Sequence, residues 1–316
     1  MTRKMGAITV DKTDVILTVL LLDNSRISYR ELAEKLGLSV NAVHKRIQSL
    51  IDSGIIRRFT AKISLSALKV VSVVVYGKSE ADSVGTLHEV LSSHGSIRWV
   101  ALAGGNYLYI LAHLRSISEL EPLIDYIKKE AKVTSPTVGI IPPTPINVST
   151  SAEATLYPLD REIIYSLRDN SRKALTDIAE ELGVSAKTVR RRLSGMINKG
   201  LIELSMEWYP DASNDIMTVV HIRLKPAVEK NAVSNVLKTY FPNMIFYWSF
   251  SNLPNELLSV FWTNTMKELR DIQQRLVSEE TVESIMPNIL YTGYIFDTWR
   301  DELIRPTRSE TKNKKS

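Results

Sequence analysis

The chain has 316 residues, 44% hydrophobic and 24% charged, which is the composition of an ordinary globular protein and the length of two or more domains. Its lack of cysteine excludes a disulfide framework, a thiolate nucleophile and any cysteine-based metal site. The formal net charge of +5 permits a polyanionic partner, and no apolar run approaches the roughly 20 residues that a membrane-spanning helix needs.

The first residues with a clear hydrophobic periodicity predict a helix-turn-helix. Apolar residues recur at helical spacing between Val15 and Leu22, and a second, short helix is expected from about residue 28 to residue 36. Gly37 ends that helix, because glycine is favoured where φ becomes positive just past a helix end, and Ser39 can cap a third helix. In this arrangement the last helix enters the DNA major groove.

The third helix has an outward face of polar side chains. With Val43 placed inward on a helical wheel, Asn41, Lys45 and Gln48 point away from the core. A strand follows, which we expect to form the stem of a wing and to hold the DNA backbone through two arginines. The expected DNA-binding set of this copy is Ser39, Asn41, Ala42, His44, Lys45, Arg46, Gln48, Arg57 and Arg58.

The next part of the chain predicts a ferredoxin-like module. Its expected elements are a strand at 70–76, a helix at 84–91, strands at 97–102 and 107–114, a helix at 118–129 and a strand at 137–141. The two middle strands are joined by Ala103-Gly104-Gly105-Asn106, which is typical of a hairpin. This order gives an antiparallel sheet with helices on one face. A second copy in the same chain is the expected cover for the other face.

The chain repeats itself at an offset of 146 residues. Asp23-Asn24-Ser25-Arg26 returns as Asp169-Asn170-Ser171-Arg172, and the register then holds without a gap through the third helix of each copy. Farther on, only matched apolar positions remain, such as Val73 and Val219. This pattern predicts duplication of one two-part unit.

The third helix of the second copy is more basic than that of the first. No acidic residue occurs between Leu182 and Ile202. The expected DNA-binding set here is Ser185, Lys187, Thr188, Arg190, Arg191, Arg192 and Ser194. A solvated helix face is the simpler explanation of such charges, but the turn, the cap, the single sign of charge and the repetition together favour DNA. Glu203 and Glu207 follow this helix and would oppose a phosphate, so the first wing is expected to hold the backbone better.

These patterns divide the chain into six expected segments of an α+β protein. They are winged helix-turn-helix domains at 1–62 and 157–209, ferredoxin-like modules at 63–142 and 210–304, a proline-containing linker at 143–156 and a disordered basic tail at 305–316.

Leu32 to Ser39, Val43 to Ile47 and Leu50 to Ile56 resemble the winged helix-turn-helix of the leucine-responsive regulatory protein and asparagine regulator (Lrp/AsnC) family, and the second copy does so from Leu159 to Ile202. The resemblance implies that the ferredoxin-like part pairs subunits and senses an amino acid or related metabolite. It would place a ligand at the hairpin, at Gly104, Gly105 and Asn106. The aspartate that usually follows the glycine in the family is missing here, and a turn role alone explains both glycines.

We therefore expect a sequence-specific regulator of transcription that binds double-stranded DNA, without catalytic residues, metal or cofactor. A homodimer in the cytoplasm, associated with the nucleoid and not with a membrane, is the expected state. The five histidines have no recognised metal spacing. The expected architecture is also similar to that of siroheme decarboxylases. A tetrapyrrole enzyme of that kind is therefore the alternative to a DNA-binding regulator. A chromatin protein indifferent to sequence is a third reading.

Overall fold

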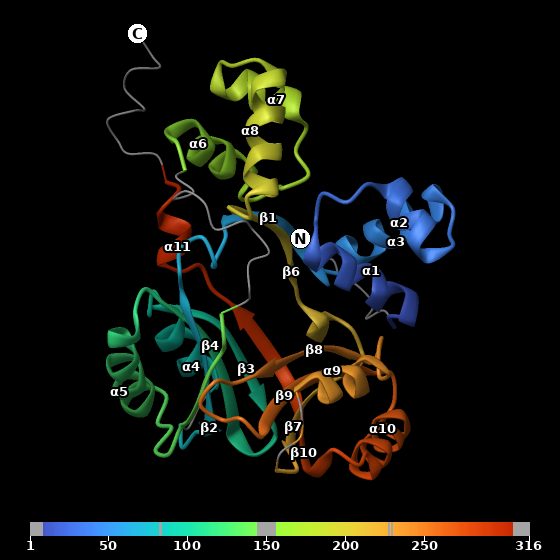
Figure 1. Ribbon diagram of the computed structural model, residues 1–316, viewed down its shortest axis with the longest axis vertical. Coiled ribbons are helices and arrows are strands. Elements are labelled where there is room, and N and C mark those ends of the chain that lie inside the picture. The colour runs from blue at the N-terminus through green and yellow to red at the C-terminus, as the bar shows by residue number, and fades with distance from the viewer. Residues whose placement is uncertain (1–8, 82–83, 144–155, 227, 229, 306–316) are drawn as a thin grey trace.

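The computed structural model describes residues 9–81, 84–143, 156–226, 228 and 230–305. Figure 1 shows two helical units at one end of the molecule and a large sheet with its own helices at the other. The expected linker and basic tail fall almost wholly outside the described residues. None of the helices in the described ranges is long and apolar enough to cross a membrane.

The first helical unit has the predicted order. It consists of α1 (Lys12–Asp23), α2 (Tyr29–Leu36) and α3 (Val40–Asp52), followed by strand β1 (Ile56–Ile63). Gly37 has a φ of 65° at the end of α2, in the left-handed region that favours glycine. The Ser39 hydroxyl accepts a hydrogen bond from the Ala42 amide at 3.1 Å and so caps α3.

The second unit repeats these devices at the same offset. It consists of α6 (Pro158–Leu167), α7 (Leu175–Leu182) and α8 (Ala186–Asn198), followed by strand β6 (Ile202–Trp208). Gly183 has a φ of 66°, and the Ser185 hydroxyl accepts a hydrogen bond from the Thr188 amide at 3.1 Å. The two recognition helices therefore begin at positions fixed by the same turn and the same cap.

The strands that follow the recognition helices pair with each other, so the expected wing stems form one two-stranded sheet shared by the two copies. β1 and β6 run antiparallel, with Phe59 opposite Met206 and Thr60 opposite Ser205. These two pairs are equivalent, because adding 146 to Phe59 and Thr60 gives Ser205 and Met206, as expected for a pseudo-twofold axis between the copies. Met206 of β6 is buried in the core of α1–α3, whereas Ala61 of β1 is buried in that of α6–α8. Each helical unit thus completes its core with the strand of the other copy.

Both ferredoxin-like modules have the predicted order. The first consists of β2 (Val71–Lys78), α4 (Val84–Ser92), β3 (Ile97–Ala103), β4 (Tyr107–Leu114), α5 (Leu120–Glu130) and β5 (Thr137–Ile140). The second consists of β7 (Ile216–Leu224), α9 (Lys230–Lys238), β8 (Met244–Ser249), β9 (Glu256–Thr263), α10 (Met266–Ser278) and β10 (Val282–Ile295). Short helices η1 (Gly104–Asn106), η2 (Ile117–Glu119), η3 (Pro210–Ala212) and α11 (Trp299–Glu302) complete the described elements.

One long strand joins the two modules into a single eight-stranded sheet of order β5-β2-β4-β3-β10-β7-β9-β8. β10 pairs with β7 along its first part and with β3 along its last part. The faces without helices share one core, in which Val74 and Tyr109 of the first module lie with Val219 and Val260 of the second. The expectation that the second copy covers the first is confirmed.

The repeat is not in exact register within these sheets. Val73 lies in the core beneath the helices of its module, whereas Val219, its match at the offset of 146, lies in the core between the modules. Side chains alternate along a strand, so a shift of one residue moves every side chain to the other face. The match of Val73 with Val219 is therefore a coincidence of apolar residues.

Candidate nucleic-acid interface

The predicted recognition face of α3 is exposed. Asn41, His44, Lys45 and Gln48 are all accessible to solvent, and the partly covered Ala42 lies beside them. The opposite side of the helix, with Val43, Ile47 and Leu50, is buried. A set of long polar side chains on an anchored helix is able to reach base edges in a groove.

The corresponding face of α8 is exposed and cationic. Lys187, Arg190, Arg191 and Ser194 are accessible to solvent. Thr188 is partly covered, and its hydroxyl lies 2.9 Å from the hydroxyl of Ser185. The exposed set combines two guanidinium groups with an ammonium group, which suit phosphates and the acceptor edge of guanine.

Two arginines of the predicted sets, Arg46 and Arg192, make ion pairs inside their own domains. Arg46 lies 2.7 Å from a carboxylate oxygen of Asp14 and 2.9 Å from one of Asp11, and the Asp14 contact is the main cause of its raised pKa. Arg192 lies 3.7 Å from Asp160. Because Asp160 matches Asp14 at the repeat offset, both pairs are one structural device. The repeat of these aspartates was the sequence signal, and the DNA contacts expected of both arginines stay a prediction.

Arg57 and Arg58 also differ in role. The Arg58 guanidinium lies 2.6 Å from Glu207, 2.9 Å from Asp169 and 3.0 Å from Asp297, and its hydrogen bond to Glu207 is the main cause of its raised pKa. Arg57 is exposed and stacks over the Tyr209 ring at 3.4 Å. The charge of Arg58 is balanced within the protein, and the expected contacts of both arginines with the DNA backbone stay a prediction.

The identical tetrads of the repeat meet at the pseudo-twofold axis. The hydroxyls of Ser25 and Ser171 lie 2.6 Å apart, and both residues are fully buried. Arg26 donates to the carbonyl of Ser171, and Arg172 donates to the carbonyl of Ser25. These reciprocal contacts fix the two helix-turn-helix units against each other. The repeated tetrad was visible in the sequence, but only the structure shows that its two copies contact each other.

The hairpin glycines serve the turn. Gly105 has a φ of 67°, and Gly105 and Asn106 are exposed. The Asn106 carbonyl accepts a hydrogen bond from the Ser79 amide at 2.8 Å. Turn geometry accounts for Gly105 and Asn106, and a ligand at Gly104, Gly105 and Asn106 stays a prediction.

The sequence comparisons agree with this geometry. A winged helix-turn-helix DNA-binding family model matches residues 11–57 and 158–203. An uncharacterized HTH-type transcriptional regulator of Pyrococcus furiosus is 32% identical over 125 residues, which are 38% of this chain and 84% of that protein. The HTH-type transcriptional regulator LrpA of Pyrococcus horikoshii is 29% identical over 31% of this chain and 71% of its own length. The chain belongs to the Lrp/AsnC family.

Each of these relatives matches about a third of the chain, while the family model matches it twice. The chain therefore carries two Lrp/AsnC units in tandem, and DNA-binding regulation of transcription is its function. The crystal structure of the siroheme decarboxylase NirDL has a TM-score of 0.57 over 93% of this chain and 96% of that chain, at 14% sequence identity. That likeness shows a shared fold and no more.

Proposed function

We propose that the two recognition helices read the two halves of one asymmetric DNA site. The observation that carries this proposal is that two exposed helix faces of different chemistry are held by one pseudo-symmetric frame. Asn41, Lys45 and Gln48 of α3 correspond to Lys187, Arg191 and Ser194 of α8 at the repeat offset. In an ordinary homodimer both half-sites would meet the same side chains, so the operator would be a palindrome.

The chemistry of the two faces predicts different half-sites. Amide side chains such as Asn41 and Gln48 pair with the adenine edge, whereas Arg191 is suited to a bidentate contact with guanine. We therefore expect an adenine-containing half-site under α3 and a guanine-containing half-site under α8. The expected separation of the half-sites is about one helical turn, roughly 34 Å, or a multiple of it.

Selection of bound fragments from a random pool of duplex DNA tests this proposal. The selected site should be asymmetric, and symmetrised versions built from either half should bind more weakly. A variant with Lys187→Asn, Arg191→Lys and Ser194→Gln gives α8 the face of α3 and should then prefer the symmetric site built from the first half. Equal affinity of the wild-type chain for all three sites would contradict the proposal.

We infer that the chain has no catalytic activity, because its sequence relatives are regulators and its exposed helix faces suit DNA. Because the chain shares its fold with a siroheme decarboxylase, siroheme binding is the alternative function to test. Titration with siroheme, followed by its Soret band, should show no binding under conditions in which the selected duplex binds tightly. Siroheme uptake without duplex binding would favour the enzyme.

Family membership also supports three further proposals. We expect a homodimer of this chain, association with the nucleoid in the cytoplasm and a small-molecule effector such as an amino acid. Light scattering at several protein concentrations tests the dimer. Calorimetric titration of the full chain with amino acids tests the effector.

A further inference from the structure

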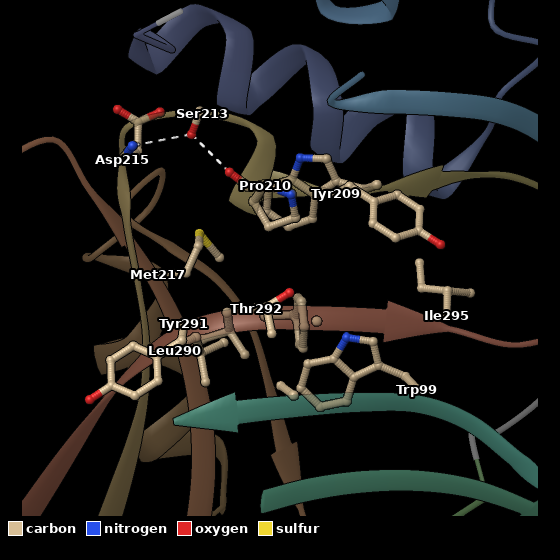
Figure 2. Close-up of a pocket in the computed structure, with 15 residues that line it drawn as sticks. Trp99, Tyr209, Pro210, Ser213, Asp215, Met217, Leu290, Tyr291, Thr292 and Ile295 are labelled. Carbon is tan, nitrogen blue, oxygen red and sulfur yellow. Dashed lines mark hydrogen bonds between the residues drawn. The ribbon is translucent and has the colours of Figure 1, made fainter. Parts of the chain in front are cut away.

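An apolar cavity lies between the end of β6, which packs on the first helix-turn-helix unit, and the joined sheets. It has a volume of about 180 Å³ and is bounded by the end of β6, by η3 and by β3, β7, β8, β9 and β10. Figure 2 shows Tyr209 and Pro210 on one side of the open space and Trp99 and Leu290 on the other. The cavity therefore separates a DNA-binding element from the ferredoxin-like body.

The walls of the cavity favour a flat, apolar ligand. Trp99, Trp208, Tyr209 and Phe246 contribute aromatic rings, and Met217 adds a soft, adaptable contact. A buried cavity of about 150 Å³ with apolar walls is enough to bind benzene. A space of this size accordingly fits one ring or two small fused rings.

The cavity also offers an unused hydrogen-bond donor. The indole N–H of Trp99 donates to no residue in the part of the chain that the structure describes. It faces Gly293, where an added Cβ would come within 3.5 Å of the nitrogen. A ligand with one acceptor atom gains a hydrogen bond from this donor that a pure hydrocarbon does not, so such a ligand is favoured.

The charge of the walls excludes an amino acid at this place. Of the fifteen residues that line the cavity, none is lysine, arginine or histidine, so a ligand carboxylate would lack a counter-charge. The one ionisable acid, Asp215, already accepts hydrogen bonds from the Val10 amide at 3.2 Å and from the Asn264 side chain at 2.9 Å. A neutral ligand satisfies these walls best.

The cavity touches both DNA-binding units. Trp208 ends β6, which continues from the recognition helix α8. Asp215, which lines the cavity, accepts a hydrogen bond from the amide of Val10, and Val10 directly precedes Asp11, the cap of α1. A ligand that fixes this region will fix the positions of both recognition helices relative to the body.

Another indole of the chain lies near the end of β1. Ile63 at the end of β1 corresponds to Tyr209 after β6, and its carbonyl accepts a hydrogen bond from Arg300. The neighbouring Trp299 is buried against the first module and donates its indole N–H to the His113 carbonyl at 2.7 Å. An indole of the chain itself is therefore packed near the end of β1, against the first module.

We propose that the cavity is an effector site for a neutral aromatic compound of one or two fused rings with one hydrogen-bond acceptor. Its occupation changes the affinity for DNA by fixing the end of β6, and with it the helix-turn-helix units, against the sheets. The regulatory half of this inference rests on the proposed function, whereas ligand binding itself does not.

Nuclear magnetic resonance of the ¹⁵N-labelled indoles in the full chain tests the binding, with quinoline as the probe. Quinoline should shift the Trp99 indole resonance in a saturable way, whereas benzoate and L-phenylalanine should leave it in place. Trp99→Phe removes the donor and should weaken quinoline binding, measured by calorimetry, about tenfold. Trp248→Phe is the matched control. The ring centroids of Trp248 and Trp99 lie 5.8 Å apart, but Trp248 does not line the cavity.

A second variant blocks the space without removing the donor. Leu290→Trp should abolish quinoline binding, and its far-ultraviolet circular dichroism shows whether it folds. Failure of quinoline to shift the Trp99 resonance, or an equal shift with L-phenylalanine, overturns the site.

Fluorescence anisotropy with the selected duplex tests the regulation. Saturating quinoline should change the affinity of the wild-type chain at least threefold and leave that of Leu290→Trp unchanged. Quinoline binding with unaltered duplex affinity overturns regulation but leaves the site. A chain that binds quinoline but no duplex at all refutes the proposed function and the regulatory half together.

Discussion

The arginines of the helix-turn-helix units fall into two groups that composition does not distinguish. Arg190 and Arg191 are exposed on α8. Arg46, Arg58 and Arg192 are each paired with at least one carboxylate of the protein. A guanidinium group that is already paired and partly desolvated gains little from a phosphate, whereas an exposed one releases counterions when it binds DNA.

Arg191→Ala is expected to relax the base preference of the second half-site. The lost contact should cost about 1 to 3 kcal/mol of discrimination at one position, with little change in the stability of the fold because the side chain is exposed. Competition binding with single-base variants of the selected site measures this effect. Arg190→Ala serves as the neighbouring control, and an equal loss of affinity for every sequence would show that Arg191 contacts only phosphate.

Arg57→Ala and Arg58→Ala are expected to have different effects. Arg57→Ala should weaken binding to all duplexes alike and reduce the slope of log affinity against log salt by about one. Arg58→Ala leaves Glu207, which is 5% exposed, without its partner at 2.6 Å and should lower the free energy of unfolding by about 2 kcal/mol. Urea denaturation and salt titration separate the two. A reduced salt slope for Arg58→Ala at unchanged stability would contradict this division.

Among the elements, the strands of the joined sheets carry the contacts between the two copies. Gly139 of β5 lies directly against the ring of Phe250, which follows β8, and a Cβ built on Gly139 would come within 2.3 Å of that ring. The Ser251 amide donates to the carbonyl of Ile140 at 2.8 Å, next to this contact. The absence of a side chain at residue 139 lets the modules meet here.

Gly139→Ala is expected to destabilise the fold. The added methyl group would force the buried Phe250 ring or the strand to move, at a cost of about 1 to 3 kcal/mol in the free energy of unfolding. Gly195→Ala in α8 is the matched control, because its Cβ would meet nothing within 4 Å and alanine favours a helix. Chemical denaturation of both variants measures the difference, and equal stabilities would refute the packing argument.

Across the whole molecule, buried polar groups lie where the copies meet. His221 of β7 contacts the Tyr109 hydroxyl of β4 at 2.6 Å, and Asn288 of β10 donates to the same hydroxyl. Burial lowers the pKa of His221 to about 4. The pKa of His113 is lowered to about 3 by burial first and then by Arg300, Arg98 and Lys62. Both histidines are neutral in the folded protein near neutral pH.

Stability should therefore fall as the pH falls below about 6.5. Between that value and about 4 the unfolded chain binds a proton at each of these histidines and the folded chain does not, so protonation favours unfolding. Each histidine should contribute a slope of up to about 1.4 kcal/mol per pH unit. Urea denaturation at pH 7 and pH 5 measures the slope. His221→Gln keeps a polar partner for Tyr109 and should reduce it, and an unchanged slope would exclude His221 as a contributor.

Local sequence signals determined the elements and their order. Gly37, Gly183, Ser39 and Ser185 set the ends of helices through their own backbone or side chain, and alternating apolar residues set the strands. These effects act within a few residues, so both helix-turn-helix units, both ferredoxin-like modules and the exposed recognition faces could be predicted.

Contacts between distant residues decided the rest. The pairing of β1 with β6, the carboxylate partners of Arg58 and the cavity beside Trp99 all join segments more than a hundred residues apart. No local pattern distinguishes an arginine that faces a groove from one that faces a buried glutamate, because the difference is made by what folds against it. A duplicated sequence predicts two similar halves, but only packing shows that Trp299 is buried near the end of β1 and that a cavity lies at the end of β6.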